Sequence, residues 1–297
     1  MATKRQRFLR ILIPYFYLSP SIIFLILFTY WPVINSVYLS LFRHSVLNPI
    51  PIFTWLGNYE SILKEEIFPT VLKNTLIYAI GTIPFTMFLA FSLAVLINEK
   101  IGWLRNIYRV SMFYPTMIPM AAAGMLAVWL FNPGIGLVNY YLGKLGLKGP
   151  QWLYSMEWAL PAIMITAIWK NFGYFMILFL AGLQNINKEL YESSELEGAG
   201  FFQKLRFITI PLLGPTTVFV IIVGVITSFQ VFDLVHIMTQ GGPADQTNVI
   251  VYFIYQYAFR FWDIGKASAL TVLFLIGLLT FIIMLVRNIE RKVHYEV

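Results

Sequence analysis

The chain has 297 residues, of which 59% are hydrophobic and 12% charged, and it contains no cysteine. A soluble globular domain does not normally carry so few charges, so the composition indicates a membrane protein. The lack of cysteine excludes disulfides, thiolate metal sites and cysteine nucleophiles. In a membrane protein, the net charge of +7 reflects basic loops on the cytoplasmic side and does not indicate binding to nucleic acid.

Apolar segments long enough to cross a bilayer, which requires about 20 helical residues, occur six times in the chain. The first segment exceeds one crossing, so we expect residues 11–17 to lie along the inner surface before Pro20 begins the span. Two prolines, Pro115 and Pro119, mark the third segment. The predicted spans are residues 11–41, 71–97, 110–131, 158–183, 210–234 and 267–286.

Basic residues predict the orientation of these spans. Thirteen lysines and arginines fall at the two ends, in the second inner loop and between the fourth and fifth spans, against seven in the opposite segments. The positive-inside rule therefore places both termini in the cytoplasm. On the outer side we expect loops at residues 43–70 and 132–157 and a short interfacial helix at residues 249–261.

The segment between the fourth and fifth spans is unusually charged. Asn187 is placed to cap a short helix whose glutamates suit the positive end of the helix dipole. Gly198 can adopt the left-handed conformation that stops such a helix. A second short helix with Lys204 on its polar side is predicted next, and we expect Pro211 to end it. The pattern indicates a helix–turn–helix element that docks a partner.

This element resembles the EAA loop of the membrane subunits of ABC importers. The pattern contains a Glu, two small residues, a Gly and, after nine more residues, Ile-x-x-Pro, with serines here in place of the usual alanines. The resemblance implies helices at residues 187–211 that enter a cleft of an ATPase subunit. It also implies a transporter core at residues 71–287, preceded by an N-terminal segment, first span and external loop at 1–70 and followed by a cytoplasmic tail at 288–297. The coupling residues that it implies are Glu192, Ser193, Ser194, Gly198, Ala199, Lys204, Ile208 and Pro211.

Nucleotide and metal sites are not predicted on this chain. The P-loop run of Gly, four residues and Gly-Lys-Ser/Thr is missing from the sequence, so we expect no ATP hydrolysis by this chain and no enzyme activity. The three histidines are too scattered to predict a metal cluster. The resemblance implies ATP and magnesium on a partner ATPase, with no cofactor on this chain. It further implies a second homologous permease subunit, two ATPase subunits, an external substrate-binding protein and surrounding membrane lipid as partners.

Lys170 lies near the middle of the fourth span, where an unpaired ammonium group is expensive. It belongs either to a translocation path or to an internal ion pair that fixes helix packing. Sugars have an apolar ring face and a rim of hydroxyls, so a sugar path needs aromatic and uncharged hydrogen-bonding groups, although aromatic residues in spans also serve packing. Asp233 suits a solvated span end better than a ligand contact. The candidate path residues are Trp169, Lys170, Asn171, Tyr174, Phe229, Gln230 and Asp233.

A turn at Gly241-Gly242-Pro243, followed by aromatic residues, is similar to the carbohydrate branch of the ABC importer family. We therefore expect an all-α protein with six transmembrane helices and the type I importer fold, located in the cytoplasmic membrane of a prokaryote. Its expected function is ATP-driven import of an oligosaccharide or sugar derivative by alternating access. The alternatives are a permease for a non-carbohydrate solute, an ion-coupled secondary transporter that uses Lys170 and Asp233, and a scaffold that recruits a soluble partner.

Overall fold

The computed structural model describes residues 4–45, 48–98 and 103–290. Helices form most of this part, and five of them are long and apolar enough to cross a membrane, or six when one sharply bent pair is taken as a single span. This confirms the predicted all-α membrane fold. The chain divides into two compact units, Met1–Glu65 with Ile254–Phe274 and Glu66–Phe253 with Leu275–Val297.

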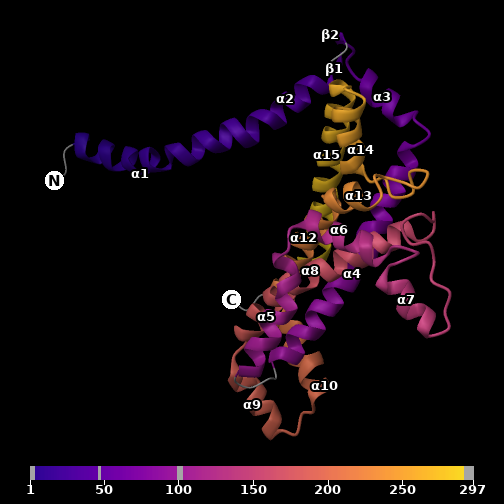
Figure 1. The fold of residues 1–297 in the computed structure, drawn as a ribbon. Coiled ribbons are helices and arrows are strands. Elements are labelled where there is room, and N and C mark those ends of the chain that lie inside the picture. Colours follow the sequence, from indigo (N-terminus) through magenta and orange to yellow (C-terminus); the bar gives the residue numbers. More distant parts are fainter. Residues whose placement is uncertain (1–3, 46–47, 99–102, 291–297) are drawn as a thin grey trace. The chain divides into compact units, whose positions relative to one another are not determined.

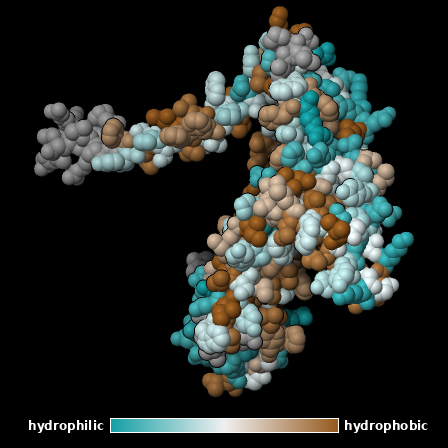
Figure 2. Space-filling model, viewed as in Figure 1, coloured by the Kyte–Doolittle hydropathy of each residue, from teal (hydrophilic) through white to brown (hydrophobic). Residues whose placement is uncertain are grey.

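A long N-terminal helix opens the first unit. It consists of α1 (Lys4–Leu25), a π-helical turn η1 (Ile26–Tyr30) and α2 (Trp31–Ser40) (Figure 1). The helix runs through Pro20 without a break, and the stretch that is long and apolar enough to span a membrane covers Pro14–Ser40. Its large apolar side chains are exposed along the described part, as the brown atoms of this helix show in Figure 2. Such a surface requires lipid or a protein partner around it.

A β-hairpin follows where an irregular outer loop was predicted. β1 (Phe42–Ser45) pairs antiparallel with β2 (Asn48–Phe53), with Phe42 opposite Phe53. The two prolines of β2 disfavour a helix in this segment. An edge strand, in contrast, tolerates proline. Asn58, in α3 (Gly57–Leu63), donates hydrogen bonds to the carbonyl oxygens of Ser40 and Phe42 and so fixes the hairpin to the end of α2.

The second unit is built around α4 (Phe68–Asn98) and α8 (Ala159–Gln184), which pack against each other more extensively than any other pair of elements. Helix α12 (Gly214–Phe229) packs against both. Small residues on α4 allow this close packing, since Ala90 and Ala94 are completely buried against the aromatic and aliphatic face of α8. These three helices enclose most of the unit's buried apolar residues.

The third predicted span is not a single straight helix. It is split into α5 (Trp103–Met117) and α6 (Met120–Leu130), whose axes differ by 93°. Pro119 explains the break, because it has no amide hydrogen to donate and disfavours helical geometry at the residue before it. The fifth predicted span is also interrupted, and its apolar stretch runs over Gly214–Met238.

The remaining elements are short, apart from the last helix. The short helix predicted near residues 249–261 is present as α14 followed by a π-helical turn, η3. The bounds are α7 (Leu137–Lys144), α9 (Lys188–Leu196), α10 (Phe201–Lys204), η2 (Leu205–Thr209), α11 (Ile210–Leu212), α13 (Asp233–Met238), α14 (Ile250–Tyr255), η3 (Gln256–Arg260) and α15 (Ile264–Glu290).

Candidate functional site

The predicted helix–turn–helix element is present between α8 and α12. The Asn187 side chain caps α9, since its Oδ1 accepts a hydrogen bond from the Glu189 amide at 3.0 Å. Gly198 ends this helix in the left-handed conformation, with φ of +83°. Its amide donates to the Glu195 carbonyl, and the next amide, that of Ala199, donates to the Ser194 carbonyl. The cap and the glycine turn are therefore confirmed at the predicted residues.

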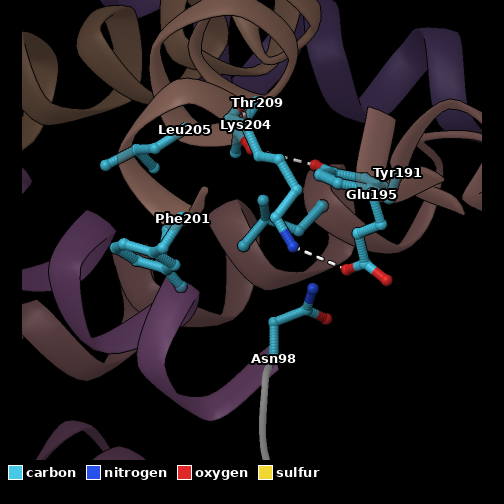
Figure 3. A pocket seen from close by; sticks show the side chains of 9 residues that line it. Asn98, Tyr191, Glu195, Phe201, Lys204, Leu205 and Thr209 are labelled. Carbon is cyan, nitrogen blue, oxygen red and sulfur yellow. Dashed lines mark hydrogen bonds and ion pairs between the residues drawn. The ribbon is translucent and has the colours of Figure 1, made fainter. Parts of the chain in front are cut away.

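A salt bridge closes the turn between α9 and α10. The Lys204 ammonium group lies 2.6 Å from Glu195 Oε1, as Figure 3 shows. A hydrogen bond of 3.0 Å joins the hydroxyls of Tyr191 and Thr209 on the same two arms. Both contacts connect residues on opposite sides of Gly198 and so join the two arms. Glu195, before the glycine, and Lys204, after it, form the ion pair across the turn.

The second arm does not end at Pro211 as predicted. Helical structure continues from α10 through η2 and α11 to Leu212. The π-helical turn η2 carries the hydrogen bond from the Ile210 amide to the Leu205 carbonyl, and Pro211 then occupies the first turn of α11. Proline is tolerated there because its missing amide hydrogen is not needed.

A pocket of about 120 Å³ lies beneath the two arms (Figure 3). Its walls come from the C-terminal ends of α4 and α8 and from both arms of the helix–turn–helix element. The pocket therefore lies between the two arms and the ends of two spans. The lining residues are Val95, Asn98, Leu183, Tyr191, Glu195, Phe201, Lys204, Leu205 and Thr209.

The outer surface of the same element exposes apolar side chains. Leu196, at the end of α9, is 91% exposed, and Phe202, at the start of α10, is 80% exposed. An open groove of about 340 Å³ beside them is lined by residues that include Ser194, Gly198 and Ile208. Exposed apolar side chains next to a concave surface are typical of a protein contact.

A second candidate site is a small polar pocket between α4, α8 and α12. Tyr78 and Thr86, both more than nine-tenths buried, line it together with Asn171. Within the described part of the chain, none of these three side chains has a hydrogen-bond partner. Thr82 and Ser228 line it as well, and their hydroxyl oxygens lie 3.2 Å apart. The pocket has a volume of about 20 Å³ and room for one water-sized group.

Lys170 points away from this pocket, although it neighbours Asn171. It is 6% exposed, and its ammonium group donates to the carbonyl oxygen of Thr116, at the end of α5, over 2.7 Å. It forms no salt bridge with any residue that the structure describes. The partner of Lys170 is thus a backbone carbonyl, and not the carboxylate that an internal ion pair requires.

The other predicted path residues do not form one cluster. Trp169 lines a separate apolar pocket with α6, and Tyr174 is 39% exposed. The ring of Phe229 contacts that of Phe281 of α15 in a tilted arrangement. Gln230 and Asp233 are exposed, in agreement with a solvated end of the fifth span. Only Asn171 of the predicted set lies in the polar pocket.

Comparison with known proteins identifies the family to which the chain belongs. Residues 83–295 match the model of the family described as "Binding-protein-dependent transport system inner membrane component". The chain belongs to this family. It is therefore a permease subunit of an ABC importer, a multi-pass inner-membrane component and not an enzyme, and the ATPase is a separate subunit. Membership of this family excludes the two alternatives of a secondary transporter and a scaffold.

Named relatives and a solved structure agree with this assignment. The permease is 36% identical to the sulfoquinovosyl glycerol transport system permease protein SmoG of Agrobacterium fabrum, over 86% of this chain and 83% of that protein. It is 31% identical to the sn-glycerol-3-phosphate transport system permease protein UgpA of the same organism, over 96% and 97%. It resembles a chain of the bacterial alginate ABC transporter in complex with an alginate pentasaccharide-bound periplasmic protein, with a TM-score of 0.85, 25% identity and 97% coverage of both chains.

Sequence reasoning missed the residue of the permease that holds the loop at residues 239–250. Backbone conformations with positive φ cluster at Gln240, Gly241, Ala244 and Asp245. Asn74 of α4 donates hydrogen bonds to the carbonyl oxygens of Asp245 and Asn248, at 2.8 and 3.0 Å. A buried asparagine in an apolar span was the available signal, because such a side chain must find partners.

Proposed function

We propose that this permease imports a carbohydrate or a sugar derivative through a path that includes the polar pocket between α4, α8 and α12. The observation that carries the proposal is the chemistry of the pocket: it is lined by hydroxyl groups, those of Tyr78, Thr82 and Thr86 on buried residues, and by the amide of Asn171, with no charged side chain. Sugar hydroxyls are both donors and acceptors and suit such groups. The printed names of relatives, which include sulfoquinovosyl glycerol and alginate transport, support the same solute class.

The small pocket volume corresponds to a closed state of this path. Because α12 packs against both α4 and α8, a tilt of α12 would widen the pocket and expose Asn171, Tyr78 and Thr86 to the solute. Alternating access then requires a force on the inner ends of these helices. The pocket beneath the helix–turn–helix element supplies the mechanical connection, since its walls include α4, α8 and both arms.

In the proposed complex, residues 187–211 form the coupling element for an ATPase subunit. The exposed Leu196 and Phe202 would fill a cleft on that partner, and Gly198 sets the angle between the arms. Glu192 and Ser193 lie exposed on α9, and Ala199, Lys204, Ile208 and Pro211 support the second arm. ATP and magnesium belong to the ATPase, with both termini and this element in the cytoplasm.

The proposed assembly contains a second homologous permease subunit, two ATPase subunits and an external substrate-binding protein. Membrane lipid or the second permease would cover the apolar surface of α1 and α2. The outer loop at residues 239–250 is the proposed contact for the binding protein, because it is an ordered loop held by α4 through Asn74. We place this assembly in the cytoplasmic membrane of a prokaryote.

Copurification after gentle solubilisation tests the coupling element. We expect an ATPase and a second permease to copurify with the native chain and the ATPase to be lost from Leu196→Asp. Leu196 is almost fully exposed, so this change leaves the fold intact. Leu145→Asp is the matched control, since Leu145 is 75% exposed but lies just after α7. Retention of the ATPase by Leu196→Asp, or its loss from both variants, contradicts the assigned role.

Uptake by the assembled importer in proteoliposomes tests the solute class. ATP-dependent uptake of a labelled oligosaccharide or sugar derivative is expected, and Asn171→Leu should raise the KM for that solute without releasing the ATPase. Exclusive uptake of a non-carbohydrate solute would refute the carbohydrate assignment while leaving the ABC importer family unaffected.

A further inference from the structure

The break in the third span leaves part of α5 without its usual hydrogen bonds. In a continuous helix, the Thr116 carbonyl would accept from the amide four residues later. Helix α5 instead ends at Met117, and α6 begins at Met120 after a turn of 93°. The Thr116 carbonyl therefore needs another donor, because an unsatisfied carbonyl inside a membrane costs several kcal/mol.

Lys170 of α8 is this donor. Its ammonium group donates to the Thr116 carbonyl at 2.7 Å, and in return the Thr116 hydroxyl donates to the Lys170 carbonyl at 3.2 Å. Two hydrogen bonds thus join the end of α5 to one turn of α8. A cation at this position also suits the negative end of the α5 dipole, which partly compensates the burial of a charged side chain.

A close backbone contact one turn further along α8 supports the same arrangement. A Cβ atom added to Gly173 would lie 2.3 Å from the Met112 carbonyl oxygen of α5 and 3.0 Å from the Phe113 Cα. Residues three apart lie on the same face of a helix, so Lys170 and Gly173 both face α5. Helices α5 and α8 are therefore held together over two successive turns. Hydrogen bonds join the first turn, and direct backbone contact joins the second.

The residue after Lys170 faces a different neighbour. Successive helical residues are rotated by about 100°, so when Lys170 faces α5, Asn171 points into the polar pocket between α4 and α12. A rotation of this turn that broke the contact with Thr116 would also turn the Asn171 side chain, which lines the polar pocket together with Thr86 and Ser228. The contact between Lys170 and Thr116 thus defines the orientation of one wall of the pocket.

We propose that Lys170 is a positioning residue for transport, which caps the carbonyl end of α5, holds the bend of the third span and orients Asn171 toward the solute path. The functional part of this inference rests on the proposed role of the polar pocket. Lys170 itself touches neither the solute nor a coupling ion. Its effect on transport passes through the arrangement of α5, α6 and α8.

A distance measurement tests the structural part without any transported solute. The chain has no native cysteine, so spin labels can be attached to single cysteines at Val110 of α5 and Met125 of α6, both exposed. In the assembled importer, Lys170→Met should broaden the distance distribution between the labels, whereas Lys170→Arg, which keeps a cationic donor, should restore the narrow native one. Lys73→Met, at an exposed lysine of α4, is the matched control and should leave it unchanged.

Uptake kinetics test the functional part on the same variants. For Lys170→Met we expect the maximal rate to fall about tenfold, the equivalent of one lost hydrogen bond, and KM to rise together with the broadened distances, because Asn171 is displaced. Lys170→Arg should recover most of the rate. If Lys170→Met does not assemble, Thr116→Val, which removes only the hydroxyl donor, should still broaden the distances and lower the rate to a smaller extent.

Two results would overturn the proposal. One is a native distance distribution in both Lys170→Met and Thr116→Val. The other is a large rise in KM at native distances, which would make Lys170 a direct solute contact. A native complex that takes up no carbohydrate would contradict the proposed solute class only, because the distance measurement does not depend on the solute.

Discussion

Gly173 of α8 approaches the Met112 carbonyl oxygen of α5 so closely that an added Cβ atom would lie 2.3 Å from it. The obstacle is backbone, which cannot move aside as a flexible side chain can. Glycine in the middle of a helix normally weakens it by roughly 0.5–1 kcal/mol relative to alanine. Close packing of two helices is therefore the physical reason for a glycine at this position.

This contact predicts opposite effects for two similar substitutions. Gly173→Ala should destabilise the protein by about 1–3 kcal/mol, because α5 and α8 must separate. Gly277→Ala in α15 should be neutral or stabilising, since nothing lies within 4 Å of its added Cβ. Thermal unfolding of the two purified variants in the same detergent provides the comparison, and equal midpoints would contradict the close approach.

A glycine is required at position 198 because of the backbone conformation there, and not because a larger side chain would clash with its neighbours. An added Cβ at Gly198 meets no atom within 4 Å, but its φ of +83° is unfavourable for other residues. Gly198→Ala should therefore weaken the turn by roughly 1 kcal/mol and reduce stimulation of the partner ATPase by solute. Gly143→Ala isolates the conformational effect, because Gly143 is equally open but has no positive φ. Native coupling in Gly198→Ala would show that the turn geometry is not needed.

Asn74 should hold the outer loop through both of its amide hydrogens. Asn74→Asp keeps the size of the side chain but replaces the donor group by an acceptor facing two carbonyl oxygens. We expect a loss of about 1–3 kcal/mol of stability and faster proteolysis of residues 239–250. Lys73→Ala, at the exposed neighbouring position, is the control. Unchanged proteolysis of the Asn74→Asp loop would argue against this attachment.

The surroundings of Tyr257 in the folded permease predict that the protein loses stability at alkaline pH. Burial raises the pKa of the Tyr257 phenol, and the hydrogen bond that it donates to Glu65 and the charges of Glu65 and Asp263 raise it further. The folded state then holds the phenol proton more tightly than the unfolded state. The contribution of Tyr257 to the free energy of unfolding is therefore complete below about pH 10 and is lost as the pH rises further. Tyr257→Phe should flatten this alkaline decline in the unfolding midpoint, and an identical decline in the variant would contradict the assignment.

Local patterns in the sequence were sufficient for the coupling element. The Asn187 cap and the Gly198 turn depend on hydrogen bonds between residues a few positions apart, so their spacing along the chain was informative. The hydropathy of the spans likewise identified their positions, because a bilayer requires about 20 apolar residues whatever their neighbours. The effect of Pro119 on the third span was a partial exception, since its position predicts a break but not the 93° angle.

Only the tertiary structure decided which neighbours contact each face of a span. A span that is apolar on all sides has no periodicity to show which residues face its neighbours. Lys170 could therefore be assigned equally to a path or to an ion pair, and its true partner, the Thr116 carbonyl, became available only because another helix breaks beside it. The polar pocket combines Thr86, Asn171 and Ser228 from three helices far apart in the chain, and only packing brings them together.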